Sequence, residues 1–94
     1  MKIYKIWQIV NYGYDTYSDA VVCAESEYKA KRINPGGFRE MGEDDKWYFV
    51  YADGEKKLDD DDSWAELKDI KVEYIGEAKE GLEEGILCSS FHAG

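Results

Sequence analysis

Thiols, an imidazole and clustered carboxylates are the side chains of this 94-residue chain that could ligate a metal or perform catalysis. Cys23, Cys88 and His92, the single histidine, supply at most three ligands, whereas a structural zinc site uses four. Cys88 and the serines after it precede His92 on one short strand-like segment, where successive residues alternate faces and no orienting acid is evident. We therefore expect no catalytic residues, no metal and no other cofactor, and thus a protein that is not an enzyme.

The densest group of carboxylates is the run Asp59 to Asp62. A calcium loop of the EF-hand type needs carboxylates at alternating positions, a central glycine and a glutamate at the twelfth position, and this run lacks that pattern. Adjacent carboxylates repel one another and need water. We interpret the run as a solvated acidic loop, with a weak cation site or a protein-docking patch as the alternatives.

The acidity of the chain is local. Its net charge of −9 arises beyond residue 35, because residues 1–35 carry five Lys and Arg against four Asp and Glu. Such a field disfavours direct binding of nucleic acid, which depends on neutralising phosphates, and it attracts a basic protein surface. The predicted partner-binding face comprises Asp44, Asp45, Asp59, Asp60, Asp61 and Asp62, flanked by Trp47 and Trp64. These two tryptophans are predicted either as anchors of the interface or as core residues.

A second candidate site is the tyrosine-rich loop between the first two expected strands. A turn has no packing need for several tyrosines, whereas exposed tyrosine gives binding loops contact area at a low entropic cost. The residues concerned are Tyr12, Tyr14, Asp15, Tyr17 and Asp19. The alternative is that these side chains fold over the short helix and close a small core.

The elements that must position these residues indicate an α+β fold. Apolar, β-branched and aromatic runs predict strands at 2–10, 19–24, 46–52, 55–58, 70–75 and 86–91. Ser26 is a good N-cap for one short helix that ends at the Asn-Pro-Gly-Gly sequence from Asn34. We expect a mostly antiparallel sheet of five or six strands with this helix packed on it.

The length of the chain predicts a single domain over residues 1–94. No stretch approaches the roughly 20 apolar residues of a membrane-spanning helix. The first residues alternate apolar and polar side chains and so lack the apolar run of a signal peptide. We expect a cytoplasmic protein.

Several blocks of the sequence resemble a family of small, mostly uncharacterised proteins of tailed bacteriophages and prophages. The blocks are Gly13 to Tyr17 leading into Val22, Arg32 to Pro35, Val72 to Ala78, and Gly85 to Gly94. Residues 38–62 look like a variable acidic insert that contains a hairpin. The resemblance implies a phage gene product in the cytoplasm of an infected bacterium, without an activity that can be carried over to particular residues.

Charge and resemblance together favour a non-enzymatic protein that binds and inhibits a host protein through its acidic surface. By analogy, such a protein is an anti-defence factor of the anti-CRISPR kind that occupies a basic channel. The alternatives are a protein that sequesters a nucleotide or other small molecule through the tyrosine loop, and a phage accessory or assembly protein. Under the last alternative, the chain would be a homo-oligomer joined through a sheet edge.

Overall fold

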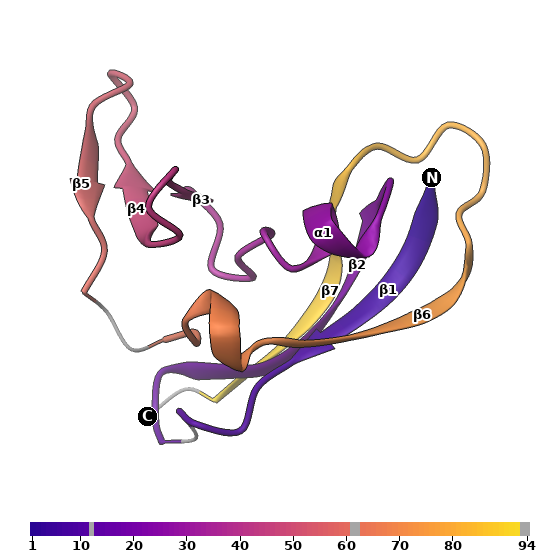
Figure 1. The fold of residues 1–94 in the computed structure, drawn as a ribbon, viewed down its shortest axis with the longest axis horizontal. Helices are drawn as coiled ribbons and strands as arrows, with labels where there is room; N and C mark the ends of the chain where they lie inside the picture. The colour runs from indigo at the N-terminus through magenta and orange to yellow at the C-terminus, as the bar shows by residue number, and fades with distance from the viewer. Residues whose placement is uncertain (12, 61–62, 93–94) are drawn as a thin grey trace.

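The computed structural model describes residues 1–11, 13–60 and 63–92, which form two antiparallel sheets, one short α-helix and one 3-10 helix (Figure 1). The strands are β1 (Lys2–Trp7), β2 (Thr16–Ala24), β3 (Arg39–Met41), β4 (Trp47–Val50), β5 (Lys56–Leu58), β6 (Lys71–Glu77) and β7 (Gly85–His92). The helices are α1 (Glu27–Ala30) and η1 (Leu67–Asp69). No helix among these residues is both long and apolar enough to cross a membrane.

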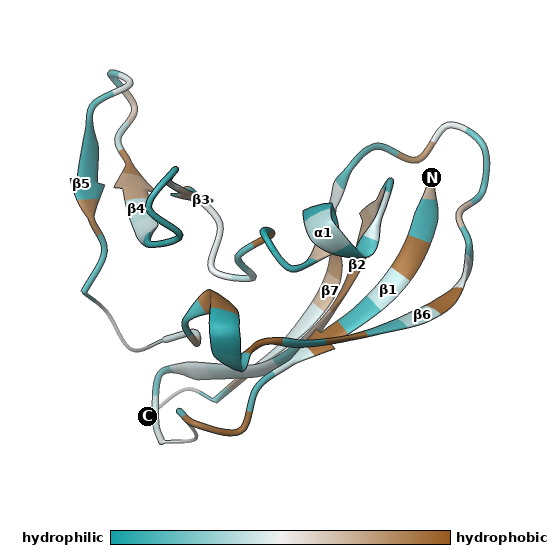
Figure 2. Ribbon diagram, viewed as in Figure 1, coloured by the Kyte–Doolittle hydropathy of each residue, from teal (hydrophilic) through white to brown (hydrophobic). Residues whose placement is uncertain are grey.

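The larger sheet has the strand order β6-β1-β2-β7, and all its pairings are antiparallel. Along β1, Tyr4 and Ile6 are buried on one face, whereas Lys5 between them is exposed (Figure 2). In the register of β1 and β2, Tyr4 lies opposite Val22. This alternation fixes which face of the sheet carries the core, because a slip of one residue would expose the whole apolar set.

The smaller sheet has the order β3-β4-β5 and is made entirely from the acidic segment 38–62. Its outer strand β5 is exposed throughout, as a short and charged edge strand should be. Gly54 has a φ of 88° in the turn between β4 and β5, where a residue with a side chain would be strained.

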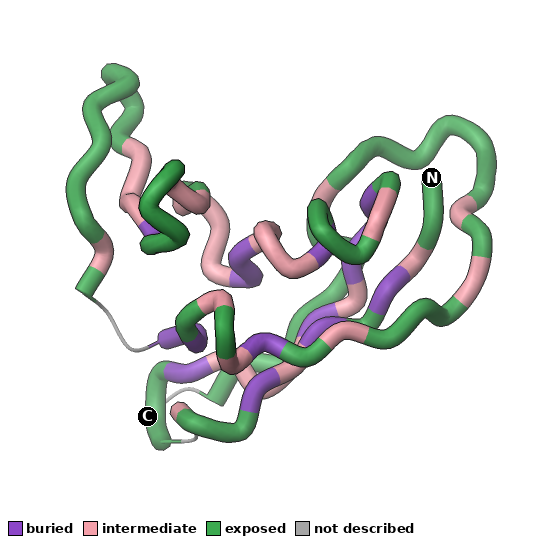
Figure 3. The backbone as a smooth tube through the Cα atoms, viewed as in Figure 1, coloured by how far each residue is buried: buried purple, intermediate pink, exposed green. Residues whose placement is uncertain are grey.

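The core lies where the two sheets and α1 meet (Figure 3). Tyr4, Ile6 and Val22 come from the larger sheet, and the indoles of Trp47 and Trp64 enter from the smaller sheet and from the segment that follows it. Alanines at several contact points leave room for the large rings; they are Ala20, Ala24, Ala30 and Ala65. The acidic segment therefore supplies part of the common core.

The helix α1 is shorter than expected, at four residues. The predicted N-cap is present, because the Ser26 hydroxyl accepts a hydrogen bond from the backbone N–H of Lys29 at 3.3 Å. The chain leaves the helix before the predicted stop, and the buried Asn34 side chain closes the next turn by accepting from the Gly36 N–H at 2.8 Å.

The mostly antiparallel architecture with one short α-helix is confirmed, but the expected single sheet of five or six strands is not, because the described residues form seven strands in two sheets. The strand missed from the sequence is β3, whose residues Arg39–Met41 are polar and lie in a segment expected to be irregular. β3 is a strand because β4 supplies its hydrogen-bonding partner, with Glu40 opposite Tyr48. Pairing with a neighbouring strand is not visible in the β-propensity of three polar residues.

Candidate functional site: an acidic cleft between the two sheets

An open cleft of about 670 Å³ lies between the smaller sheet and the segment around η1. Six carboxylates from three separate stretches of sequence line it: Asp44, Asp45, Asp59, Asp60, Glu66 and Asp69. Two lysines, Lys46 and Lys68, line it as well. We call this feature the acidic cleft.

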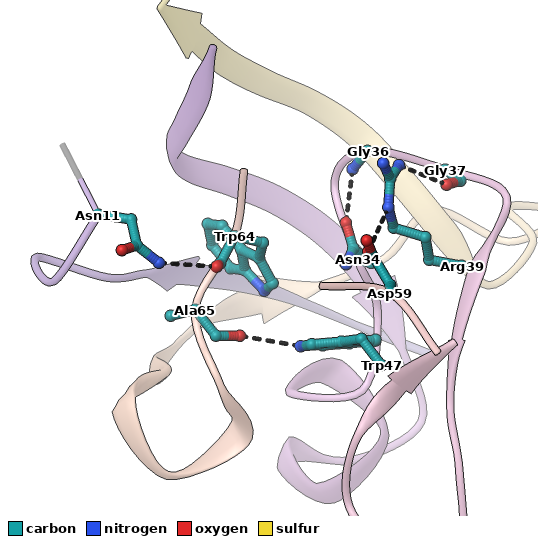
Figure 4. A network of polar contacts seen from close by, with 9 residues as sticks. All are labelled: Asn11, Asn34, Gly36, Gly37, Arg39, Trp47, Asp59, Trp64 and Ala65. Carbon is teal, nitrogen blue, oxygen red and sulfur yellow. Dashed lines mark hydrogen bonds and ion pairs between the residues drawn. The ribbon is translucent and has the colours of Figure 1, made fainter. Parts of the chain in front are cut away.

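The wall of the acidic cleft is built on Trp47 and Trp64, which are 8% and 4% exposed. The indole N–H of Trp47 donates to the carbonyl of Ala65 at 2.8 Å (Figure 4). This bond joins β4 to the segment that carries Glu66 and Asp69. Of the two predicted roles for the tryptophans, the structure gives them the core role, and they reach the cleft only at its wall.

The opposite side of the cleft is positioned by the loop after β1. Gln8 is buried, and its side-chain N–H groups donate to the carbonyls of Asn11 at 2.6 Å and Tyr17 at 2.7 Å. Its side-chain oxygen accepts from the N–H groups of Val10 and Asn11. Asn11 in turn donates to the carbonyl of Trp64 at 2.9 Å (Figure 4). Sequence reasoning missed Gln8, and the available signal was its place within the mostly apolar run 2–10.

Asp59 lines the cleft, but its side chain forms an ion pair within the protein. The Arg39 side chain donates from Nε to Asp59 Oδ2 at 2.6 Å, and these two side chains are only 14% and 8% exposed (Figure 4). The backbone N–H of Asp59 also donates to the Trp47 carbonyl at 2.9 Å. Of the predicted acidic face, Asp59 is therefore the residue that ties the end of β5 to β3 and β4.

Asp44 and Asp45 lie in the turn between β3 and β4. The Tyr48 hydroxyl donates to Asp44 Oδ2 at 2.6 Å, and this hydrogen bond lowers the pKa of Asp44 below its ordinary value. Gly42 leaves room for the pair, since a Cβ there would lie 2.5 Å from the Tyr48 ring. Asp45 has a φ of 60° and faces Arg32 across 3.8 Å. Both carboxylates are thus positioned at the rim of the cleft.

The remaining carboxylates of the cleft are Asp60, Glu66 and Asp69. Asp60 and Glu66 are exposed, and Glu66 lies 3.8 Å from Lys68 in an exposed ion pair. Glu66 and Asp69 were not among the predicted site residues, because the acidic face was drawn around the carboxylate run. Asp61 and Asp62, which were predicted for this face, lie outside the described residues.

The tyrosine loop is not assembled as one site. Tyr14 is 81% exposed, whereas Tyr17 packs against the core and against the Phe91 ring, at a centroid distance of 4.6 Å. Asp15 is exposed in the turn, with its backbone N–H bonded to the carbonyl of His92, and Asp19 lies within β2. Tyr12 lies outside the described residues. The structure therefore separates the loop into a core side chain and an exposed one.

The potential metal ligands lie as follows. Cys23 is buried in β2, Cys88 is exposed in β7, and both are free thiols. His92 ends β7 and is exposed. Within residues 1–11, 13–60 and 63–92, no three His, Cys, Asp or Glu side chains are grouped so that they could hold a metal ion.

Comparisons of the chain with models of protein families, with curated proteins and with solved structures find no match.

Proposed function

We propose that the acidic cleft binds a basic segment of a partner protein, and that the chain acts by occupying that segment. The observation that carries the proposal is the convergence of six carboxylates, distant in sequence, on one open cleft. Carboxylates around a concave surface accept arginine or lysine side chains, and arginine can bind a carboxylate through two parallel hydrogen bonds.

The charges of the cleft are only partly compensated within the chain. Ion pairs engage Asp59, Asp45 and Glu66. Among the residues that the structure describes, no ion pair neutralises Asp44, Asp60 or Asp69. A basic partner would supply the missing charge and would be steered toward the cleft over a distance set by the salt concentration.

The resemblance to phage proteins extends the proposal to a biological setting. In that setting the partner is a host protein with a basic surface, for example the nucleic-acid-binding channel of a defence complex, and the result of binding is inhibition. The support for this step is the sequence blocks that carry the resemblance, together with a net charge of −9 that disfavours binding of nucleic acid by the chain itself.

Two variants that change the net charge equally test the proposal. Asp60→Asn with Asp69→Asn neutralises two of the six carboxylates of the cleft, and Glu83→Gln with Glu84→Gln neutralises two exposed carboxylates in the connection before β7, outside the cleft. Tagged protein is used to capture partners from the lysate of an infected host. We expect the wild-type chain and the second variant to retain a basic host protein at low salt and to release it at high salt.

The first variant should lose most of that partner. Equal losses from both variants would show that only the total charge matters and would refute a role for the cleft. Equal retention by both variants would refute it as well.

A further inference from the structure

The strand β7 forms an edge of the larger sheet and, among the strands of the described residues, pairs only with β2. Among the elements of the described chain, β2 is also the only one that contacts it. Three large apolar residues of β7 are exposed: Ile86, Leu87 and Phe91 at 38%, 42% and 46%. An uncovered edge with apolar side chains is a template for pairing with another strand.

The two edges of this sheet differ in charge. The other edge, β6, carries Lys71, Glu73 and Glu77, which are exposed charges of the kind that prevent edge-to-edge pairing. From Gly85 to Phe91, β7 has no charged residue and no proline. In a chain with a net charge of −9, β7 is therefore the edge at which two copies can meet without bringing carboxylates together on the paired strands.

The hydrogen bonds within the chain indicate which backbone groups of β7 face outward. The His92 carbonyl accepts from the N–H of Asp15, so His92 faces the β2 side. Because backbone groups alternate along a strand, those of Cys88 and Ser90 also face β2, and those of Ser89 and Phe91 face away from it. The register agrees, since Ser90 pairs with Asp19 and Cys88 with Val21.

A hydrogen bond on the other side of β2 leads to the same assignment. The backbone N–H of Gln8 donates to the Ser18 carbonyl at 3.2 Å. It places the backbone groups of Ser18, Ala20 and Val22 toward β1, and therefore those of Asp19 and Val21 toward β7. Two independent hydrogen bonds thus identify Ser89 and Phe91 as the residues with outward-facing backbone groups.

We propose that two copies of this chain pair antiparallel through β7, about a two-fold axis at Ser90, to form one continuous sheet. In this register Ser89 of each copy lies opposite Phe91 of the other, and about four new backbone hydrogen bonds form. An axis at Ser89 would instead pair Phe91 with Leu87, where the strand bulges between Val21 and Val22 of β2. An axis at Phe91 would require residue 93, outside the described residues.

The proposal commits to a second copy because the edge is self-complementary. Each copy offers the same two outward-facing residues at the spacing that the other copy needs, and the Phe91 ring, already packed on Tyr17, becomes covered by the partner's strand. A closed two-fold interface of this type uses the same patch on both subunits. Repulsion between two acidic chains opposes it, so added salt should strengthen this pairing and should weaken binding at the acidic cleft.

Disulfide cross-linking between introduced cysteines tests the proposed register of the two β7 strands. Opposed residues of a non-hydrogen-bonded antiparallel pair have Cα atoms about 4.5 Å apart, within the range of a disulfide. In a Cys88→Ser background, Ser90→Cys should form a covalent dimer under mild oxidation. The control, Ser89→Cys in the same background, places its thiol opposite Phe91 and should form little covalent dimer. Equal cross-linking of the two, or no cross-linking of the first, would overturn the proposed register.

Multi-angle light scattering over a range of protein concentrations tests the association itself. The wild-type chain should reach twice the monomer mass, at lower concentration when salt is added. Ser89→Pro removes an outward N–H without touching the pairing with β2 and should be monomeric, whereas Ser89→Ala should dimerise like wild type. Circular dichroism verifies that the proline variant is folded. A monomeric wild-type chain at every concentration, or a folded proline variant that dimerises normally, would refute the proposal.

Discussion

Asp59 and Asp60 are adjacent in sequence and both line the acidic cleft, yet the structure assigns them different roles. Asp59 forms a nearly buried ion pair with Arg39, whereas Asp60 is exposed. The same substitution, Asp to Asn, should therefore destabilise the fold at residue 59 and leave it almost unchanged at residue 60. This comparison separates the carboxylate that holds the cleft together from one that is available to a partner.

The magnitude follows from burial. Removing one partner of a buried ion pair costs about 3–5 kcal/mol when the other charge is left uncompensated. Arg39 would keep a hydrogen bond to the Gly37 carbonyl at 3.2 Å and its position 5.4 Å from the Phe49 ring. We therefore expect Asp59→Asn to lower the free energy of unfolding by about 2–3 kcal/mol, out of a total of roughly 5–14 kcal/mol for a domain of this size.

Urea denaturation followed by tryptophan fluorescence measures the difference. With a slope of about 2 kcal/mol per molar urea, Asp59→Asn should lower the midpoint by about 1 M. Asp60→Asn should change the free energy of unfolding by no more than about 0.5 kcal/mol. If the two variants unfold at the same urea concentration, the structural role assigned to the Arg39–Asp59 pair is incorrect.

Two further predictions concern the wall and the rim of the cleft. Trp47→Phe should cost about 1–3 kcal/mol more than Trp64→Phe in urea unfolding, because only the Trp47 indole N–H has a hydrogen-bond partner among the described residues; equal costs would count against that bond. The lowered pKa of Asp44 means that its ionised form stabilises the fold above the ordinary pKa of 3.8 and that this contribution is lost as the pH falls through the folded-state pKa. The urea midpoint of Asp44→Asn should therefore decrease less than that of the wild-type chain as the pH is lowered below about 4. The same decrease in both proteins would contradict the Tyr48–Asp44 bond.

The larger sheet was largely predictable from the sequence, because its strands carry their own signal. The run Lys2–Trp7 is rich in β-branched and aromatic residues, and the short apolar segment around Val22 follows a turn-rich loop, so an antiparallel hairpin could be inferred. The sequence also identified 55–58 as a charged edge strand, which the structure confirms as β5. Local sequence patterns are sufficient to predict a strand when one of its faces is buried and the other is exposed to solvent.

The cleft could be predicted only in part, because it depends on contacts between distant segments. The acidity of the segment was evident, but the burial of Asp59 depends on Arg39, twenty residues earlier, and nothing in the local sequence distinguishes Asp59 from Asp60. Likewise, Asp69 reaches the cleft only because Trp47 anchors the segment around Ala65. Long-range pairing decides which carboxylates are structural, and local charge patterns carry no information about it.

The central claim is that the acidic cleft, and not the overall negative charge, recognises basic segments. Its most direct test is a titration of isotope-labelled protein with a short arginine-rich peptide at low salt, followed by amide chemical shifts. We predict shifts concentrated in residues 44–46, 58–60 and 64–69, which disappear at high salt and in the variant with Asp60→Asn and Asp69→Asn. Shifts of equal size in the acidic connection 77–84, or a peptide affinity that this variant leaves unchanged, would contradict it.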